Sequence, residues 1–291
     1  MISIIISSVN AKMLSAVKKN IADTIGVPYE VISFDNASGK RGLCEIYNSG
    51  VSKARYDLLC FMHEDVEILT TNWGDEVAEI MGDETIGLLG VAGSSYKSLT
   101  PGGWACPGIE AKTNKVNIIQ RYKYSEGGTK KEYFNSENEQ LSQVATIDGV
   151  WMCTRKSITD SVKFDEQTLP LFHGYDVDIS LQVAKEHKVV VTFNILLDHF
   201  SEGNYSTDWL KSAMQISLKH QQCLPLNISG LDAKASSRGE KMACRALLKM
   251  LSAEKYSAWA KVSVLWNFKL YRVLGFGGFL SFNFKILIGR Y

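Results

Sequence analysis

Hydrophobic residues follow two alternating patterns along the first part of the chain. Short runs rich in β-branched residues, such as residues 2–9 (ISIIISSV), are typical of strands buried on both faces. Between these runs, apolar residues recur at helical spacing, as at Met13, Val17 and Ile21. The two patterns predict strands at residues 2–9, 29–34, 56–62, 86–92 and 189–197, helices at residues 43–54, 73–81 and 176–186, and an ordered segment of unassigned type at residues 144–154.

Strands that alternate with helices predict βαβ units, and hence an α/β fold with a mostly parallel sheet. In such sheets, ligands bind beyond the carboxyl ends of the strands. Asp35 follows the second predicted strand, and His63-Glu64-Asp65 follows the third. We therefore expect these strand ends to form a binding site.

The pattern weakens in residues 93–143, which are interrupted by Pro101-Gly102-Gly103 and Glu126-Gly127-Gly128. This segment is interpreted as long loops or a small β-insertion over the site. Beyond Gly203 the chain is predicted to be helical, with a linker at residues 225–237. The expected organisation is a catalytic domain at residues 1–205 and a helical, basic extension at residues 206–291.

Composition is that of an ordinary globular protein of 291 residues, with 45% hydrophobic and 22% charged residues. The net charge of +1 hides an asymmetry, because residues 234–291 carry 11 Lys/Arg and 2 Asp/Glu, a net charge of +9. The acidic remainder, without a nucleic-acid-binding motif, argues against nucleic acid as a partner. Scattered cysteines and an amino terminus without a basic leader indicate a cytoplasmic protein.

The sequence His63-Glu64-Asp65 places two acids and a histidine directly after a hydrophobic strand. Displacement of a diphosphate leaving group requires that its negative charge is neutralised. A divalent cation held by carboxylates and phosphates does this. Asp65 is the expected ligand, assisted by Glu64 or His63. A turn whose acids are merely solvated is the alternative, and this segment alone does not decide between them.

A second acidic segment, Asp176 and Asp178, precedes an amphipathic helix and follows His173 and Tyr175. A single acid at this place is usually a helix cap or a partner of the helix dipole. Two acids beside a histidine and a tyrosine raise the alternative that one of them, Asp176, is a general base.

A histidine, His199, ends a later strand in Leu196-Leu197-Asp198-His199. A neutral imidazole is a common ligand for metals, although a single histidine at a strand end is more often structural.

Together these segments resemble family 2-like GT-A glycosyltransferases, and within them a bacterial glycosyltransferase-like subfamily. The resemblance covers residues 1–205. It is carried by the segments SIIISSVN, VISFDNASG, GLCEIYNSGVSKARYDLLCFMHEDVEI, IDGVWMCTRKS, FHGYDVDISLQV and LLDHFSEGN. It implies a GT-A fold, with a mostly parallel central sheet flanked by helices, followed here by a helical extension.

The resemblance also implies roles for individual residues. Asp176 matches the catalytic base, and Asp65 and His199 match the ligands of a divalent metal, Mn or Mg. The nucleotide of the donor is expected at Ser8, Asn10, Asp35, Asn48, Glu64 and Asp65. The donor sugar and the acceptor are expected at Asp148, Gly149, Trp151, His173 and Tyr175.

The implied reaction is an inverting transfer from a nucleotide-sugar donor to a glycan or lipid-linked acceptor. The chain departs from the family at His63, which replaces the first acid of Asp-x-Asp, and at Tyr175, which replaces the acid before the base. Two alternatives therefore stay open: a nucleotidyltransferase that makes nucleotide sugars, and an inactive nucleotide- or sugar-binding scaffold. The first is disfavoured because the loop after the first strand has no glycine.

The basic extension mixes cations with large apolar residues. Lys241, Arg245 and Lys249 lie at helical spacing, and the uncharged stretch at residues 273–284 is too short to span a bilayer. One interpretation is peripheral contact with anionic lipid at the inner face of the membrane. The other is packing on the catalytic domain or on a second subunit, so that an oligomer is also compatible with the sequence.

Overall fold

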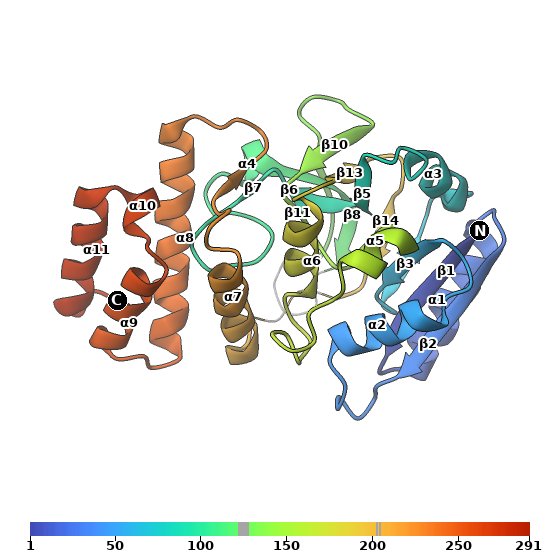
Figure 1. Cartoon of the computed structure of the whole chain (residues 1–291), viewed down its shortest axis with the longest axis horizontal. Coiled ribbons are helices and arrows are strands. Elements are labelled where there is room, and N and C mark those ends of the chain that lie inside the picture. The colour runs from blue at the N-terminus through green and yellow to red at the C-terminus, as the bar shows by residue number, and fades with distance from the viewer. Residues whose placement is uncertain (122–127, 202, 204) are drawn as a thin grey trace.

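Two β-sheets occupy the centre of the molecule, and helices surround them (Figure 1). The structure, a computed structural model, describes residues 1–121, 128–201, 203 and 205–291. Residues 122–127 belong to the segment predicted as loops or a β-insertion, and residues 202 and 204 to the motif LLDHFSEGN; all of them lie outside the described residues.

The larger sheet has seven strands in the order β10-β13-β5-β12-β3-β1-β2. Its pairings are parallel for β1–β2, β1–β3 and β5–β13, whereas β12 runs antiparallel to β3 and β5, and β10 antiparallel to β13. Five strands therefore run in one direction, which fits the mostly parallel sheet that the sequence predicts. The strands are β1 (Ile2–Ser8), β2 (Tyr29–Asp35), β3 (Leu58–Met62), β5 (Ile86–Gly90), β10 (Leu141–Val144), β12 (Trp151–Arg155) and β13 (Lys188–Thr192).

Both faces of this sheet are buried. Successive side chains of a strand point to opposite sides, so each strand contributes to both cores. In β1, Ile5 faces a core that includes residues of α2 and α6, whereas Ile4 and Ile6 face a core that includes residues of α1 and α3. The helices are α1 (Ala11–Thr24), α2 (Leu43–Lys53), α3 (Trp73–Ile80), α5 (Lys156–Ser161) and α6 (Tyr175–Val183).

Part of the smaller sheet is formed by residues 93–143, for which long loops or a small β-insertion were expected. Its order is β11-β6-β8-β14-β4, and β9 pairs with β8. It shares a core with one face of the larger sheet, to which Ile118 and Leu197 contribute. The strands are β4 (Val66–Ile68), β6 (Ala92–Ser94), β8 (Asn114–Arg121), β9 (Thr129–Phe134), β11 (Thr146–Ile147) and β14 (Leu197–His199).

Two predicted strands, and the segment at residues 144–154 that is predicted to be ordered, are each divided in the structure. Residues 86–92 form β5 in the larger sheet and begin β6 in the smaller one, and residues 189–197 are divided in the same way between β13 and β14. Residues 144–154 contribute to β10, β11 and β12. Val91, between β5 and β6, is buried, so the hydrophobic run at residues 86–92 continues without a sign of the division. Between β13 and β14 the exposed Asn194 interrupts the run, and between β11 and β12 Asp148-Gly149 does so.

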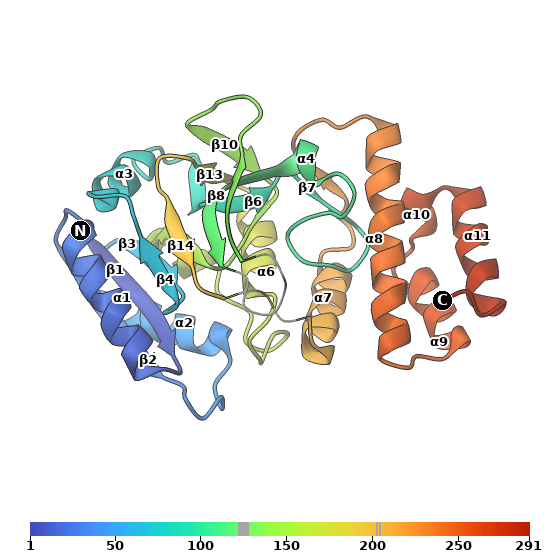
Figure 2. The ribbon, with the colours of Figure 1, turned by 180° about the vertical axis from the view of Figure 1, so that it is seen from behind.

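The C-terminal helices lie at the end of the molecule opposite β1 and β2, with α8 between α9–α11 and the sheets (Figures 1 and 2). The predicted linker at residues 225–237 is wrong in its second half, because the Asp232 side chain accepts a hydrogen bond from the amide of Ala235 and α8 begins at Ala233. Smaller elements are α4 (Glu110–Thr113), β7 (Tyr96–Lys97) and β15 (Leu226–Asn227). The C-terminal helices are α7 (Thr207–Lys219), α8 (Ala233–Ala253), α9 (Ala258–Asn267), α10 (Tyr271–Leu274) and α11 (Phe276–Leu287).

A buried carboxylate ties α8 to the rest of the fold. Glu240 is 1% exposed and accepts hydrogen bonds from the Tyr96 hydroxyl, the Leu99 amide, and the amide and hydroxyl of Thr100. Within the described residues, no helix has both the length and the apolar character needed to cross a bilayer.

Candidate active site

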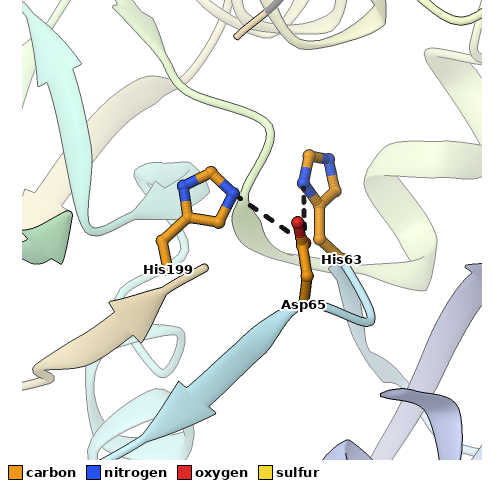
Figure 3. Close-up of side chains that lie close together, drawn as sticks. All are labelled: His63, Asp65 and His199. Carbon is orange, nitrogen blue, oxygen red and sulfur yellow. Dashed lines mark ion pairs between the residues drawn. The ribbon is translucent and has the colours of Figure 1, made fainter. Parts of the chain in front are cut away.

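Two histidines and an aspartate meet where the two sheets join (Figure 3). His63 follows β3, Asp65 directly precedes β4, and His199 ends β14. The antiparallel register of β14 with β4 pairs His199 with Val66, and the amide of Phe200 donates to the carbonyl of Asp65 at 2.9 Å. Backbone pairing between distant segments therefore brings these three side chains together.

The carboxylate of Asp65 lies between the two imidazoles. Its Oδ1 is 3.8 Å from Nδ1 of His63 and 3.8 Å from Nε2 of His199, as the dashed lines of Figure 3 mark. Burial raises the pKa of Asp65, but His63 and His199 and a hydrogen bond from Ser201 outweigh it, so that the pKa lies below its ordinary value. Asp65 is therefore a carboxylate at neutral pH.

The hydrogen bonds of Tyr175 determine which nitrogen of His63 carries the proton. The Tyr175 hydroxyl donates to the carbonyl of Gly149 at 3.1 Å, and its oxygen lies 2.8 Å from Nε2 of His63. Because the hydroxyl has one proton and a carbonyl only accepts, Nε2 of His63 is the donor in the second contact. In neutral His63, the lone pair is then on Nδ1, the nitrogen that faces Asp65.

His199 is oriented in the same way by Gln120. Nδ1 of His199 lies 3.1 Å from Oε1 of Gln120, whose amide nitrogen donates to the carbonyls of Ser201 and Arg121. Because carbonyls only accept, the Gln120 atom that faces them is the amide nitrogen, and the atom that faces His199 is Oε1. Oε1 therefore accepts a hydrogen bond from Nδ1–H of His199. In the neutral ring the lone pair is then on Nε2, toward Asp65 and the Ser201 hydroxyl. When both imidazoles are neutral, two lone pairs and one carboxylate thus converge, and such a donor set suits a divalent transition-metal ion.

The first turn of α6 brings Asp176 to the same region. The helix begins after Gly174, whose φ of +87° favours glycine and where a Cβ would lie 2.5 Å from Cδ1 of Ile216. The amide of Gly149 donates to Oδ2 of Asp176 at 3.2 Å. A Cβ on Gly149 would lie 2.2 Å from the Tyr175 hydroxyl, so this glycine is required for the contact between the two segments.

The environment of Asp176 favours its protonated form. Burial raises its pKa to about 7, the negative charge of Asp148 acts in the same direction, and amides that include those of Val177 and Gly149 oppose the shift. A carboxyl group with a pKa near neutrality has the property needed to accept a proton and release it again. Asp148 itself accepts hydrogen bonds from Nε1 of Trp104 at 2.6 Å and from the amide of Val150 at 2.8 Å.

Glu64 holds the end of β1. Its carboxylate is buried and accepts from the hydroxyl of Ser8 at 2.6 Å and from the amides of Val9 and Asn10 at 2.9 and 3.0 Å. The side chain of Asn10 caps α1. Ser8 pairs in register with Asp35, an exposed residue whose Oδ1 accepts from the amide of Ala37. Asp35, Ser8 and Asn10 therefore lie together at one edge of the sheet.

Replacing Glu64 by glutamine is expected to destabilise the fold by about 2 kcal/mol, because an amide nitrogen would face buried N–H and O–H donors. Urea denaturation would measure the change. Glu67→Gln, which alters an exposed acid on β4, is the control. Unchanged stability in Glu64→Gln would show that Glu64 does not hold the end of β1.

The structure does not bring all the predicted residues to this site. Trp151 is fully buried, with its ring 5.9 Å from that of Trp73 in the core. Its side chain is therefore inaccessible to a sugar. The side chain of Asn48 exchanges two hydrogen bonds with the backbone of Phe164, which links α2 to the loop after α5. His173 is half-buried, 3.5 Å from the hydroxyl of Ser206, and burial lowers its pKa.

Three further residues of the site were not predicted. Gln120 orients His199, Trp104 donates to Asp148, and the exposed ring of Phe172 lies 6.2 Å from that of His63. Gln120 and Trp104 lie in the segment where the hydrophobic pattern is weak. Phe172 adjoins the predicted residue His173, and this proximity is the only signal in the sequence that could have found it.

A family model described as "Glycosyltransferase like family" matches residues 3–221. The chain belongs to this family. It is therefore an enzyme that transfers sugars, a glycosyltransferase, as the resemblance of its motifs implied. The comparison with curated protein sequences finds no match.

Solved structures with the same fold agree with this assignment. The chain is similar to S. aureus TarS 1–349 in complex with UDP, with a TM-score of 0.54, 13% identity, and coverage of 100% of this chain and 92% of that one. It is also similar to GalNAc-T7 with UDP, GalNAc and Mn²⁺, with a TM-score of 0.51 and 12% identity over 88% of this chain. The chain spans only 54% of that GalNAc-T7 chain. The glycosyltransferase therefore has the predicted GT-A fold, with a helical C-terminal region.

Proposed function

We propose that the protein transfers a sugar from a UDP-sugar to a hydroxyl group of a glycan or lipid-linked acceptor, with inversion at the anomeric carbon and with a divalent metal ion. The observation that carries this proposal is the convergence of His63, Asp65 and His199 on one point, in the same site as Asp176. The Tyr175 hydroxyl and Gly149 connect the two parts. Both TarS and GalNAc-T7 were crystallised with UDP, which supports the choice of nucleotide.

His63, Asp65 and His199 would hold the metal ion. Two imidazoles and one carboxylate favour Mn²⁺ over Mg²⁺, because Mg²⁺ is usually held by oxygen atoms alone. The GalNAc-T7 structure contains Mn²⁺, which agrees with this preference. When bound, the cation supplies positive charge to the leaving diphosphate. In this proposal His63 is a ligand that takes the place of the missing first acid of Asp-x-Asp.

Replacing Tyr175 by phenylalanine is expected to weaken Mn²⁺ binding about 10- to 100-fold, because the acceptor for Nε2–H of His63 is lost and its ring is no longer oriented. Calorimetric titration with Mn²⁺ would measure the change. The matched control is Tyr96→Phe. It also removes a buried tyrosine hydroxyl, but one that donates to Glu240. Equal Mn²⁺ affinity in wild type and Tyr175→Phe would rule out this role of the hydroxyl.

Asp176 would be the general base of the transfer. Its carboxylate accepts the proton of the acceptor hydroxyl as that oxygen bonds to the anomeric carbon. The bond from that carbon to the diphosphate oxygen breaks at the same time, and the electron pair remains on the leaving group. The raised pKa of Asp176 supports the assignment, because a base that titrates near neutrality transfers protons efficiently.

The remaining residues would bind the substrates. Asp35, exposed at the end of β2, would bind the base of the nucleotide, and the backbone around Ser8 and Asn10, held by Glu64, would flank it. Asp148, Gly149 and His173 would face the sugar and the acceptor. Asn48 and Trp151 have no part in this assignment, because the Asn48 side chain is hydrogen-bonded to the backbone of Phe164 and the Trp151 ring packs on Trp73.

Calorimetry with UDP, GDP and dTDP, each with and without Mn²⁺, tests the proposal. We expect UDP to bind, and to bind more tightly with Mn²⁺ present. Slow release of UDP from a UDP-sugar in the presence of Mn²⁺ would then show that the site is active. Absence of binding for all three nucleotides would overturn the proposal, and UDP binding without turnover on any UDP-sugar would favour the inactive scaffold.

A further inference from the structure

Large apolar side chains are concentrated on the surface of the last three helices. Sixteen such side chains are exposed among the described residues, and eight of them lie in residues 255–291. Soluble monomers seldom expose large contiguous apolar patches, and those that occur mark surfaces for membranes or partners. The eight residues are Trp259, Trp266, Tyr271, Phe276, Leu280, Phe284, Leu287 and Ile288.

Four of these residues form a stripe along α11. Phe276, Leu280, Phe284 and Leu287 lie at positions i, i+4, i+8 and i+11, and therefore share one face of the helix. We call this face the apolar stripe. Phe276 and Phe284 are 77% and 63% exposed. The opposite face is also apolar, because Phe279, Phe282 and Ile286 are buried; α11 is thus hydrophobic on both sides, although only one side is covered by protein.

Two tryptophans of α9 form a second exposed apolar area in this region. Trp259 and Trp266 are seven residues apart on one face of α9, and both are more than half exposed. The ring of Trp266 lies 4.9 Å from that of Phe279, so it adjoins α11. Both helices lie at the outer end of the molecule, beyond α8 (Figures 1 and 2).

The positive charge of these helices indicates whether an anionic surface or a second copy of the chain would cover the apolar stripe. Residues 255–291 contain six Lys/Arg and no Asp/Glu. Lys269 and Arg272 are close in sequence to Trp266, and Lys285 and Arg290 to Leu287. An anionic surface complements this charge. A symmetric dimer would bring the same cationic face of two copies together without an acid on either side, which disfavours self-association.

A basic face on α8 adds to this charge. Lys234, Arg238, Lys241 and Arg245 line one hollow of about 460 Å³. They take no part in the ion pairs found among the described residues.

We propose that the apolar stripe of α11, with Trp259 and Trp266, docks the enzyme on the surface of an anionic lipid bilayer. Aromatic and leucine side chains enter the interface, and the surrounding lysines and arginines contact the lipid phosphates. With twelve residues, α11 is about 18 Å long and lies in the plane of the membrane, since a span needs about 30 Å. Docking confines the catalytic site to the surface where lipid-linked acceptors lie; in this last respect alone the inference rests on the proposed function.

Flotation of the full chain with lipid vesicles tests the docking. We expect binding to vesicles of phosphatidylglycerol mixed with phosphatidylcholine, and weaker binding to phosphatidylcholine alone. The triple variant Phe276→Ser, Leu280→Ser, Phe284→Ser should bind at least about tenfold more weakly, because each side chain loses the transfer of its apolar surface out of water. The matched control is Leu69→Ser, Tyr133→Ser, Leu218→Ser, three exposed residues on other elements, which should bind as wild type does.

A variant with fewer cationic side chains and a measurement of oligomeric state test the role of charge and the alternative of a dimer. The variant Lys269→Gln, Lys285→Gln, Arg290→Gln should bind anionic vesicles more weakly, and the difference from wild type should shrink at high salt. Equal flotation of wild type and the stripe variant would overturn the proposal, as would absence of flotation. A wild-type dimer that the stripe variant converts to monomer, without flotation, would show that a second copy covers the stripe.

Binding of UDP with Mn²⁺ is measured on the same variants. We expect it to be unchanged in the stripe variant, because these side chains lie outside the catalytic site. Loss of flotation with retained UDP binding therefore reports on docking alone. Flotation without UDP binding in wild type would contradict the proposed function and leave the docking intact.

Discussion

Replacement of Asp176 by asparagine is expected to lower the rate of sugar transfer about 100- to 10,000-fold, the usual contribution of a general base. The amide keeps the size of the side chain and can still accept the hydrogen bond from the amide of Gly149, so folding is expected to be preserved. UDP binding should change little, because Asp176 acts on the acceptor hydroxyl. The measurement is the turnover rate at saturating donor, with circular dichroism as a check of the fold.

The pH dependence of the wild-type enzyme gives a second readout for Asp176. Because burial and the charge of Asp148 raise its pKa to about 7, the carboxyl group is increasingly protonated as the pH falls below neutrality. A protonated carboxyl group cannot accept the acceptor's proton, so the rate should fall about tenfold for each pH unit well below 7. This limb should be absent from the residual rate of Asp176→Asn. Asp160→Asn, on the surface of α5, is the control and should keep both rate and profile. Full turnover in Asp176→Asn would exclude Asp176 as the base.

Replacement of Asp65 by alanine is expected to abolish Mn²⁺-dependent binding of UDP and to lower the rate about 100-fold or more. Asp65 is the side chain that faces both imidazoles, and because its pKa lies below the ordinary value it is negatively charged at neutral pH. Replacement by alanine therefore removes the charged ligand of the proposed metal site. Two neutral imidazoles alone offer no negative charge to balance a divalent cation. Calorimetry with Mn²⁺ and UDP and a turnover assay would measure the two effects.

A control and a graded comparison make this prediction specific. Glu67→Gln removes a neighbouring exposed acid on β4 and should leave Mn²⁺ binding unchanged. His199→Ala should weaken Mn²⁺ binding less than Asp65→Ala, because one imidazole and the carboxylate remain. If Asp65→Ala retained Mn²⁺-dependent UDP binding, the cation would have to be held elsewhere, and the proposed metal site would be wrong.

The two departures from the family motifs acquire a common explanation in this proposal. The hydroxyl of Tyr175, which replaces an acid before Asp176, accepts from His63, which replaces the first acid of Asp-x-Asp. Together they present a lone pair of Nδ1 toward Asp65. In the proposal, the Tyr175 hydroxyl is thus the acceptor that would orient His63 as a metal ligand.

The sequence by itself determined the positions of β1, β2 and β3 and of α1, α2, α3 and α6, because burial on two faces or on one produces periods that can be read along the chain. It also placed Asp35, Asp65 and His199 at or next to strand ends, as the structure does. The motifs around them predicted the GT-A fold and the family, both of which the comparisons bear out.

Only the tertiary structure decided how those residues are used. The lone pairs of His63 and His199 depend on Tyr175 and Gln120, which are 112 and 79 residues away along the chain. The raised pKa of Asp176 depends on burial and on Asp148, and Trp151 is withdrawn from the site by its packing on Trp73. Periodicity reports how each segment meets the interior, whereas protonation and ligand geometry are set by partners that the fold brings from elsewhere.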